Sequence, residues 1–589
     1  MENLKTINKP WDVIVIGAGL GGLTASAYAA ALGMKVLLLE QYSVLGGCSH
    51  VFRRKPNWEF DVGVHYIGDC GENGEIPNLL RGLGIDDKIE WLPLEPTGFD
   101  TIVGPDLELK VPVGWDNYLY NLIQAFPLEE KGIRRFISIV RKIGESLDIG
   151  RSAVSLAGNM KLFKDSGFAG PWMMAPLPSL FVACGLSPKL CSILSVQCGA
   201  LATSSFVMPV CLYAGFLQHY VGRGGWYPKG GGQMLAAGFG EVILSHGGEI
   251  RTDVTVDRIL IENGQVTGVR LSDGEVIHSS IVISNADIKK TYRDLVGYEY
   301  LPKKLVRRNE NWKMSWPLIN AFFGVEIDLS ETPNSNYFAI PNWDSAKSYL
   351  SLMDINSRIL TRAEKRSPID WANDFAKNQA AYIQSSTRRD PSNIHSAPVG
   401  HSAIEVQTLA PFAPKLWGIT EKQVLSGDYR DHASYQEIKE IVTDGLLQRV
   451  EQIYPGSAAK VKLRELGTPA TQQRYTLSSG GAAYGIESRI TQFGPFRPGT
   501  KTVIKGLYLA GCSTSTGAGT VGSMLSGMYA VGAILGRDLH AEVRAGKIFA
   551  DKSLLSKWSS DFDPLKASIQ MGRQSRKKDT SSVENEFVI

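Results

Sequence analysis

A glycine-rich turn near the N-terminus constrains the fold of this chain more than any other feature. Gly17, Gly19 and Gly22 form the pattern GxGxxG directly after the apolar, β-branched run 11–17. Residues 20–33 are rich in alanine and predict a helix that begins at the turn. A buried strand, a tight glycine turn and a helix in this order are typical of the opening of a nucleotide-binding α/β sheet.

Each glycine of this turn has its own physical task. Gly17 makes the tight turn, Gly19 lets the backbone approach a pyrophosphate, and Gly22 allows the helix to pack closely on the sheet. The start of the helix offers free N–H groups and the positive end of its dipole to phosphates. Glu40 ends the next predicted strand, 35–40, where its carboxylate can accept hydrogen bonds from ribose hydroxyls. The sequence therefore predicts a dinucleotide site.

Further glycines favour FAD over a nicotinamide cofactor. Gly46 and Gly47 follow Glu40 and extend the fingerprint as in glutathione-reductase-like flavoproteins. A second glycine-rich stretch, 511–527, lies near the C-terminus and would supply backbone for the flavin end of the cofactor. A second, complete Rossmann unit for a nicotinamide is not visible in the sequence.

Length and composition limit the number of domains and the classes of function to be considered. The 589 residues are too many for one hydrophobic core, so two or more domains are expected. The net charge of +3 gives no basic footprint for nucleic acid. The number of cysteines, 7, is odd and no CxxC pair occurs, which argues against zinc and against a disulfide framework. No other constellation of metal ligands is visible in the sequence. A reducing compartment fits best.

The hydropathy pattern predicts neither a secretory signal nor a membrane span. The first ten residues have no apolar run, and no stretch of about 20 apolar residues occurs. Segment 190–222 lacks Asp, Glu, Lys and Arg but is interrupted by glycine and proline, so it is interpreted as buried or membrane-facing. The expected location is cytoplasmic, with peripheral attachment to a membrane as the alternative.

Alternating apolar residues in 249–283 predict a β-meander. Asn263-Gly264 and Asp273-Gly274 lie between its segments, and both dipeptides are strong hairpin signals. Short buried strands are also predicted within 281–287 and 506–511, and a helix over 522–535.

The fold class expected from these elements is α/β: a glutathione-reductase-like FAD-binding Rossmann fold with a β-meander, plus a second α+β substrate domain. The FAD-binding domain is expected to be discontinuous, and the substrate domain to lie in the two insertions. The predicted FAD-binding segments are 11–100, 225–290 and 465–540, and the substrate-binding segments are 101–224 and 291–464. Residues 565–589 are polar and charged and are predicted to be disordered.

The chain resembles the phytoene desaturase and carotenoid isomerase superfamily of flavoproteins, and within it the retinol saturase (all-trans-retinol 13,14-reductase)-like branch. The resemblance covers about residues 11–540 and rests on four motifs. They are VIVIGAGLGG…GMKVLLLEQYSVLGGCSHVF (13–52), FDVGVHYIG (60–68), HYVGRGGWYPKGGGQMLA (219–236) and GLYLAGCSTSTGAGTVGSMLSGMYAVGAIL (506–535). The second and third are the more selective for the saturase-like branch.

The resemblance implies three sets of residues around FAD. Backbone near the pyrophosphate would come from Gly17, Gly19, Gly22, Gly46 and Gly47. The backbone of Val254 would pair with the adenine. The flavin end would lie along Gly511, Thr520, Val521 and Gly522.

The chemistry implied by the resemblance is hydride transfer to or from a C=C bond, which also requires a proton donor or acceptor. The candidate proton-handling residues are His65, Tyr66, His219, Tyr220 and Tyr484, each with a purely structural role as the alternative. The apolar substrate would lie in a tunnel along 190–222 with nearby aromatic side chains. The candidate lining residues are Trp172, Phe206, Tyr213, Phe216, Tyr220, Trp226 and Tyr227.

Three functions remain open at the level of sequence. The first is an FAD-dependent saturase or desaturase of a carotenoid- or retinoid-like polyene, served by a separate electron donor or acceptor. The second is a non-redox cis–trans isomerase that uses reduced FAD. The third is a lipid-binding or escort protein without catalytic activity on the same fold. Neither the substrate, the direction of the reaction nor the oligomeric state follows from the sequence.

Overall fold

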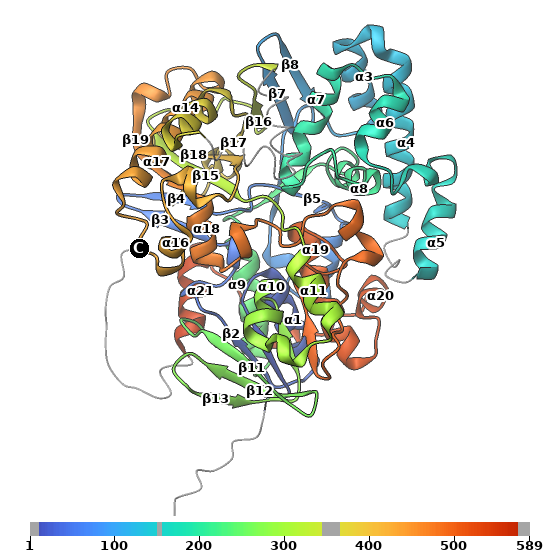
Figure 1. Ribbon diagram of the computed structural model, residues 1–589, viewed down its shortest axis with the longest axis vertical. Coiled ribbons are helices and arrows are strands. Elements are labelled where there is room, and N and C mark those ends of the chain that lie inside the picture. Colours follow the sequence, from blue (N-terminus) through green and yellow to red (C-terminus); the bar gives the residue numbers. More distant parts are fainter. Residues whose placement is uncertain (1–10, 150–155, 344–365, 575–589) are drawn as a thin grey trace, which may run out of the picture.

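The computed structural model describes residues 11–149, 156–343 and 366–574 (Figure 1). A five-stranded sheet holds the glycine turn, and every pair of neighbouring strands in it is parallel. Its strands, in spatial order, are β10 (Glu249–Arg251), β2 (Val36–Leu39), β1 (Val13–Ile16), β14 (Val282–Ser284) and β20 (Leu507–Leu509). The predicted strands in 11–17, 35–40, 281–287 and 506–511 are thus confirmed.

Both faces of this sheet are covered, which explains why its strands are continuous apolar runs. Val13 and Val15 point into a core shared with three helices, whereas Ile14 and Ile16 point into a core shared with the meander. The helices are α1 (Leu20–Ala31), α9 (Gln233–Ser245) and α19 (Gly519–Leu535). The alternation of side chains across β1 therefore joins two separate layers of core.

The predicted β-meander is present as β11 (Val256–Glu262), β12 (Gln265–Leu271) and β13 (Val276–His278). Asn263 and Gly264 both have positive φ, 51° and 75°, as the first hairpin requires. The meander and its connections lead the chain back into the parallel sheet at β14.

A second, seven-stranded sheet forms the other half of the molecule. Neighbouring strands are antiparallel except for β16 and β7, which pair in parallel. Its spatial order is β19 (Val461–Gly467), β15 (Leu318–Val325), β18 (Ser402–Leu409), β17 (Ala381–Gln384), β16 (Asn336–Ala339), β7 (Asp100–Gly104) and β8 (Leu107–Val111). Helices α14 (Pro368–Asn378) and α17 (Ala433–Ile453) share a core with it.

Helices between β8 and β9 (Gly225–Pro228) form a separate apolar layer, seen at the upper right of Figure 1. They are α3 (Trp115–Ala125), α4 (Glu130–Ile149), α5 (Leu156–Asp165), α6 (Leu177–Cys184), α7 (Pro188–Val196) and α8 (Val210–Tyr220). The charge-poor segment 190–222 therefore folds mainly as α7 and α8, and much of it is buried.

Strands from both predicted substrate segments join in the seven-stranded sheet, so the α/β plus α+β expectation holds for the fold class. Strand β19 runs across the predicted boundary between residues 464 and 465. Short strands complete the region between the two halves: β3 (Val51–Arg54) pairs with β4 (Trp58–Asp61), and β9 pairs with β5 (Ile67–Gly68) and β6 (Trp91–Pro93).

The expectation of disorder from residue 565 is wrong for its first part. Residues Pro564–Gln574 form helix α21, and Leu565 packs against Val44 and Val51. Asp563, just before the helix, accepts a two-pronged hydrogen bond from the Arg53 guanidinium at 2.7 and 3.0 Å. Apolar contacts and a paired charge thus tie this helix to the nucleotide half; residues 575–589 lie outside the described residues.

Candidate functional site

One large cavity, with a volume of about 2420 Å³, joins the two halves of the molecule. Its walls include the carboxyl ends of β1 and β2, the loop after β20, and residues of the seven-stranded sheet and of α8. In parallel α/β sheets the carboxyl ends of the strands are the usual place for a ligand. The cavity therefore lies where the glycine turn predicts a dinucleotide.

The GxGxxG turn has the geometry that its sequence predicts. Gly17 has φ of 94°, a conformation that favours glycine, and both Gly17 and Gly19 line the cavity. Gly22 is not at the cavity wall. A Cβ atom there would lie 2.0 Å from the carbonyl oxygen of Gly17, so glycine is required for the helix to approach the turn.

Gly46 and Gly47 form a second turn directly beside the first. The N–H of Gly46 donates to the carbonyl of Ala18 at 2.9 Å, and a Cβ on Gly47 would lie 3.0 Å from the Cα of Gly19. Both glycines have positive φ and line the cavity. Because glycines have no side chain, a ligand can approach the backbone N–H groups of both turns closely.

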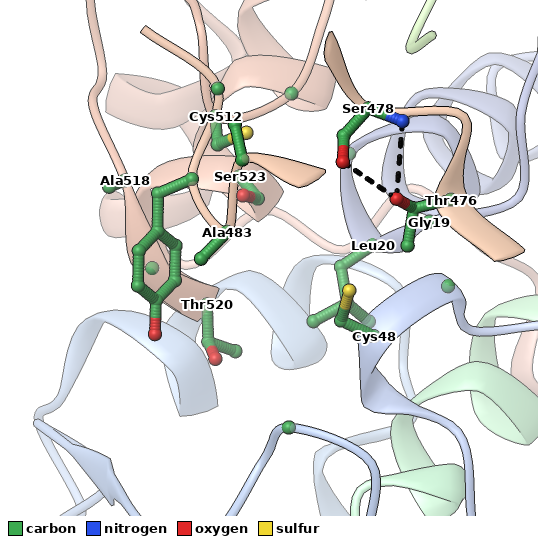
Figure 2. Close-up of a pocket in the computed structure, with 18 of the residues that line it drawn as sticks. Gly19, Leu20, Cys48, Thr476, Ser478, Ala483, Cys512, Ala518, Thr520 and Ser523 are labelled. Atoms are coloured by element: carbon green, nitrogen blue, oxygen red, sulfur yellow. Dashed lines mark hydrogen bonds between the residues drawn. The ribbon is translucent and has the colours of Figure 1, made fainter. Parts of the chain in front are cut away.

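Two helices begin at this wall, and in the described residues neither has a side-chain cap. They are α1, after Gly19, and α19, after Ala518. Figure 2 shows Gly19 and Leu20 on one side of the pocket and Ala518, Thr520 and Ser523 on the other. Uncapped N–H groups and the positive ends of two helix dipoles are suited to the negative charge of a diphosphate.

Glu40 is fixed beside the first turn. Its carboxylate accepts hydrogen bonds from the N–H groups of Ala18 at 2.6 Å and Tyr42 at 2.8 Å. Burial raises the pKa of Glu40, against the effect of these bonds. The residue also lines the cavity, so ribose hydroxyls can reach its oxygen atoms.

The backbone N–H of Val254, which was expected to pair with adenine, is already used in a hydrogen bond. Val254 lines the cavity, but its N–H already donates to the carbonyl of Glu40 at 2.9 Å. A backbone pair with adenine would therefore use the carbonyl oxygen of Val254 unless this bond opened. Gly511, Thr520, Val521 and Gly522 also lie in the cavity wall, as the resemblance implies.

Asn285 is a central residue that sequence reasoning missed. Its amide donates to the carbonyl of Gly17 at 3.3 Å, and its Oδ1 would lie 2.7 Å from a Cβ on Gly511. It therefore connects the N-terminal turn with the C-terminal glycine stretch. The available signal was its position directly after β14, which pairs with both β1 and β20.

The five candidate proton-handling residues all line the same cavity, at its aromatic wall. The ring of Tyr220 lies 4.7 Å from that of Tyr66 and 4.8 Å from that of Phe216. Tyr66 also stacks on Tyr382, a residue of β17 that the sequence did not indicate, at 6.0 Å. The structure thus brings the residues together but leaves their individual roles as predictions.

Burial favours the uncharged form of four candidate groups, His65, Tyr66, Tyr220 and Tyr484. It raises the pKa values of Tyr66 and Tyr220 well above the usual range and that of Tyr484 to about 12. For His65 burial, followed by the charge of Arg389, lowers the pKa to about 3. His65 is therefore a neutral imidazole near pH 7, which can donate a hydrogen bond but is a poor source of a full proton.

Most of the aromatic side chains predicted for the tunnel do not reach it. Phe216 and Tyr220 line the cavity, whereas Tyr213 is buried elsewhere with its hydroxyl donating to Leu194, and Tyr227 donates to Asp61. Trp172, Phe206 and Trp226 are likewise not among the lining residues. The apolar arm is lined instead by aliphatic, methionine and phenylalanine side chains. They include Leu147, Leu162, Phe163, Met173, Met174, Val196, Leu201 and Leu212.

Two other features bear on the class of site. Within residues 11–149, 156–343 and 366–574, no three His, Cys, Asp or Glu side chains gather as metal ligands would. No helix of this described part is both long and apolar enough to cross a membrane.

Comparison with known proteins agrees with the geometry. Residues 15–83 match the family model of the NAD(P)-binding Rossmann-like domain. The chain is 27% identical over 572 residues to human all-trans-retinol 13,14-reductase, which covers 90% of this chain and 87% of the relative. It is 27% identical over 555 residues to prolycopene isomerase 1 of an Oncidium hybrid, covering 90% and 86%.

Solved structures share the fold at low sequence identity. An oxidoreductase from Methanosarcina mazei superposes with a TM-score of 0.57 at 17% identity, covering 89% of this chain and 100% of that chain. A putrescine oxidase superposes with a TM-score of 0.56 at 10% identity, covering 90% and 99%. These likenesses confirm the fold class.

Proposed function

Since the chain is homologous to all-trans-retinol 13,14-reductases and prolycopene isomerases along about 90% of its length, we propose that it is an FAD-dependent oxidoreductase acting on the C=C or CH–CH bonds of a long apolar polyene. The observation that carries this proposal is the continuity of the cavity. The same cavity contains the glycine turns with their uncapped helix ends and the apolar arm between α4, α5 and α8.

The dinucleotide end of the cavity fits FAD. The backbone of Gly19, Gly46 and Gly47 would hold the diphosphate, Glu40 the ribose, and the stretch from Gly511 the flavin end. FAD, when bound, supplies the hydride chemistry that none of the protein side chains can provide. The residues of this chain would bind and orient the polyene, exclude water and control the position of a proton.

The apolar arm explains why the substrate should be a long hydrocarbon chain. Its aliphatic and methionine side chains offer dispersion contacts and no hydrogen bonds, so they favour an apolar ligand over water. The aromatic wall at Tyr66, Tyr220 and Tyr382 offers flat surfaces against which a conjugated chain can lie. Burial keeps the hydroxyls of Tyr66 and Tyr220 protonated, so they would be hydrogen-bond donors, whereas the hydroxyl of Tyr382 already donates to Asn336 at 2.6 Å.

The cavity also reaches the surface at apolar side chains. Phe163 of α5 and Met174 line it, and both are exposed, by 53% and 40%. Phe168, nearby in sequence, is 65% exposed, and Lys161 and Lys164 of α5 are exposed as well. Apolar side chains beside lysines are suited to the interface of an anionic bilayer, which supports peripheral membrane attachment and entry of the substrate from lipid.

The isomerase is the second candidate because the two classes of relative are equally similar to this chain. Saturation, desaturation and isomerisation are separated by the mass of the product. The purified protein would be photoreduced without oxygen and incubated with a panel of polyenes. Saturation adds two mass units and isomerisation none, while the oxidised protein with an electron acceptor would remove two if it were a desaturase.

The same preparation tests the remaining alternative, a lipid-binding protein without catalytic activity. A yellow protein whose flavin absorbance is bleached by dithionite is expected. A colourless protein that does not take up added FAD would contradict the proposal, and polyene binding without any change in the polyene would favour the binding protein. A separate electron donor is part of the proposal, and photoreduction replaces it in this assay.

A further inference from the structure

Helix α11 (Lys303–Asn311), which follows β14 in the chain, lies in a concentration of positive charge. Segment 289–313 contains eight lysine and arginine residues and three acidic residues, an excess that is larger than the net charge of +3 of the whole chain. Leu305 and Val306 of the helix pack against the core that the parallel sheet shares with the meander. Four exposed cations lie on its outer side: Lys303, Lys304, Arg307 and Arg308.

The acidic residues of this segment do not neutralise α11. Asp294 is paired with Arg293, and Glu299 is paired with Arg258. Glu310, in α11 itself, is exposed. In the part of the chain that the structure describes, no carboxylate oxygen lies within 4.0 Å of a side-chain nitrogen of the four cations. The positive charge of the helix is therefore left to solvent or to a partner.

The cations of α11 also repel one another. A spacing of four residues places Lys303 beside Arg307 and Lys304 beside Arg308, and like charges at this spacing destabilise a helix. An anionic partner would relieve this repulsion, so the arrangement favours binding over stability of the free protein.

Two further lysines extend the charge beyond α11. Lys289, shortly after β14, donates to the carbonyl of Glu310 at 3.1 Å and so lies against the end of the helix. Burial lowers the pKa of Lys289, and the charges of Lys313 and Arg293 lower it further, against the effect of Asp287. Lys313 is therefore a close neighbour of Lys289. Six residues together form the basic face: Lys289, Lys303, Lys304, Arg307, Arg308 and Lys313.

The basic face adjoins the loop beside the C-terminal glycine stretch. The guanidinium of Arg308 donates to the carbonyl of Phe496, which is exposed and also lines the cavity. The next residue, Arg497, is buried at the cavity wall and donates to the carbonyl of Cys512 at 2.6 Å. Cys512 follows Gly511 in the stretch that is expected to carry the flavin end of FAD. Two hydrogen bonds, at Phe496 and Arg497, thus connect the outer surface with that stretch.

We propose that the basic face is the docking surface of an acidic electron-transfer protein that supplies electrons to the flavin. The inference rests on the proposed function, which requires a donor, and the sequence shows no second Rossmann unit for a nicotinamide. Each molecule of a one-electron carrier is oxidised once, so two encounters supply the two electrons that reduce FAD, and two protons come from solvent. Complementary charge accelerates these encounters and orients the carrier at the loop.

An anionic membrane is the other partner that such a charge could attract. The exposed apolar side chains suited to a bilayer lie on and beside α5, however, and Figure 1 shows α5 and α11 apart. Beside the basic face Phe496 is exposed, and aromatic side chains are also enriched in protein interfaces. The charge and its position near the glycine stretch favour a protein partner.

The rate of flavin reduction by an acidic carrier tests this surface. The oxidised, FAD-loaded protein would be mixed without oxygen with a reduced plant-type [2Fe–2S] ferredoxin, which is strongly acidic. Stopped-flow absorbance of the flavin gives the second-order rate constant. This constant is expected to fall about tenfold or more from low to high salt, because salt screens the attraction between exposed charges. Photoreduction of the same protein needs no docking and is the reference.

Reversal of charge on α11 identifies the surface. The triple variant Lys303→Glu/Lys304→Glu/Arg307→Glu should lower the rate constant at low salt at least about tenfold and remove most of its salt dependence. Unchanged flavin content and photoreduction would show that it is folded, and the corresponding glutamine variant should have an intermediate effect. The control triple makes the same change in charge at exposed lysines elsewhere and should leave the rate constant within about twofold. Its substitutions are Lys131→Glu, Lys415→Glu and Lys422→Glu.

Equal rate constants in the charge-reversed and control variants would overturn the docking surface, as would failure of ferredoxin to reduce the unaltered protein at any salt concentration. Flotation with anionic vesicles that is lost in the charge-reversed variant, with an unchanged rate constant, would assign the basic face to a membrane and also overturn it. The polyene proposal stands in each case if the photoreduced protein converts a polyene. A protein without flavin, or without this conversion, would contradict the proposed function itself.

Discussion

A Cβ atom on Gly527 of α19 would lie 2.2 Å from the carbonyl oxygen of Gly21 in α1. The two helices therefore cross in backbone contact, and this contact brings both N-termini to the same cavity wall. Gly527→Val should separate the helices, lower the free energy of unfolding by at least about 2 kcal/mol and abolish retention of FAD. Thermal unfolding and the flavin absorbance of the purified protein measure the two effects.

Gly71→Ala is the control for this substitution. A Cβ there would have its nearest neighbour, a ring carbon of Trp226, at 3.8 Å, which is an ordinary contact. Normal flavin content in Gly527→Val would contradict the role assigned to the helix crossing.

Glu40→Gln should weaken the binding of FAD roughly tenfold while the protein stays folded. The two carboxylate oxygens of Glu40 accept hydrogen bonds from the N–H groups of Ala18 and Tyr42. In the glutamine variant an NH₂ group replaces one of these oxygens, so one of the two N–H groups would face another donor. Titration of the apoprotein with FAD, followed by flavin fluorescence, gives the affinity. Glu249→Gln on the neighbouring strand β10 is the control, since Glu249 pairs with Arg251 instead. Equal affinity in Glu40→Gln and the control would remove Glu40 from the cofactor site.

Asp61 should make the protein less stable as the pH rises. Burial raises the pKa of Asp61 from 3.8 to about 7, so between these values the folded state holds a proton that the unfolded state has lost. The free energy of unfolding therefore falls with increasing pH across this window and levels off above it. Asp61→Asn should remove this contribution. The difference in the free energy of unfolding between the unaltered protein and the variant should therefore change by a few kcal/mol from about pH 4 to pH 7.

Chemical denaturation at several pH values measures that difference. Burial also raises the pKa values of Asp100, to about 6, and of Glu487, to about 7. These two groups lower the free energy of unfolding with rising pH in both proteins, so their effect cancels in the difference. A difference that does not vary with pH would show that Asp61 is ionised in the folded protein.

Phe163 and Phe168 should be required for attachment to membranes. Replacing both by serine removes the exposed Phe163 at the cavity wall and the exposed Phe168 nearby in sequence, and it changes no residue of the buried core. Flotation with vesicles that contain anionic lipid should recover the unaltered protein and lose the double variant. Ile394→Ser is the control, because Ile394 is 77% exposed between β17 and β18 in the other half of the chain. Equal flotation of all three proteins would exclude this surface as the site of attachment.

The nucleotide half could be predicted because its signals are local. The turn at Gly17 and the hairpins at Asn263 and Asp273 depend on positive φ values and short spacings, which are visible in the sequence. The seven-stranded sheet could not be predicted in the same way. Its parallel pairing of β7 with β16 joins residues more than 200 positions apart, and no local pattern specifies it.

The residues of the candidate site also differ in whether a local sequence pattern could predict them. The five proton-handling candidates were predicted from motifs, as were six of the glycines that line the cavity: Gly17, Gly19, Gly46, Gly47, Gly511 and Gly522. Asn285 and Tyr382 were not, because each contacts a partner that is distant in sequence: Gly17 for Asn285 and Tyr66 for Tyr382. Tyr213 and Tyr227 were wrongly predicted to line the tunnel because they are aromatic. In the structure their hydroxyls donate to Leu194 and Asp61, away from the cavity.

The order of strands in the parallel sheet has a consequence for biosynthesis. Strand β1 pairs with β14, and β14 in turn pairs with β20. The five-stranded sheet that carries the glycine turn is therefore complete only after Leu509 has left the ribosome. A nascent chain cannot hold a dinucleotide until almost all of it has been made. The finished polypeptide would therefore take up the ligand after synthesis, and the concentration of free ligand would then contribute to the stability of the folded protein.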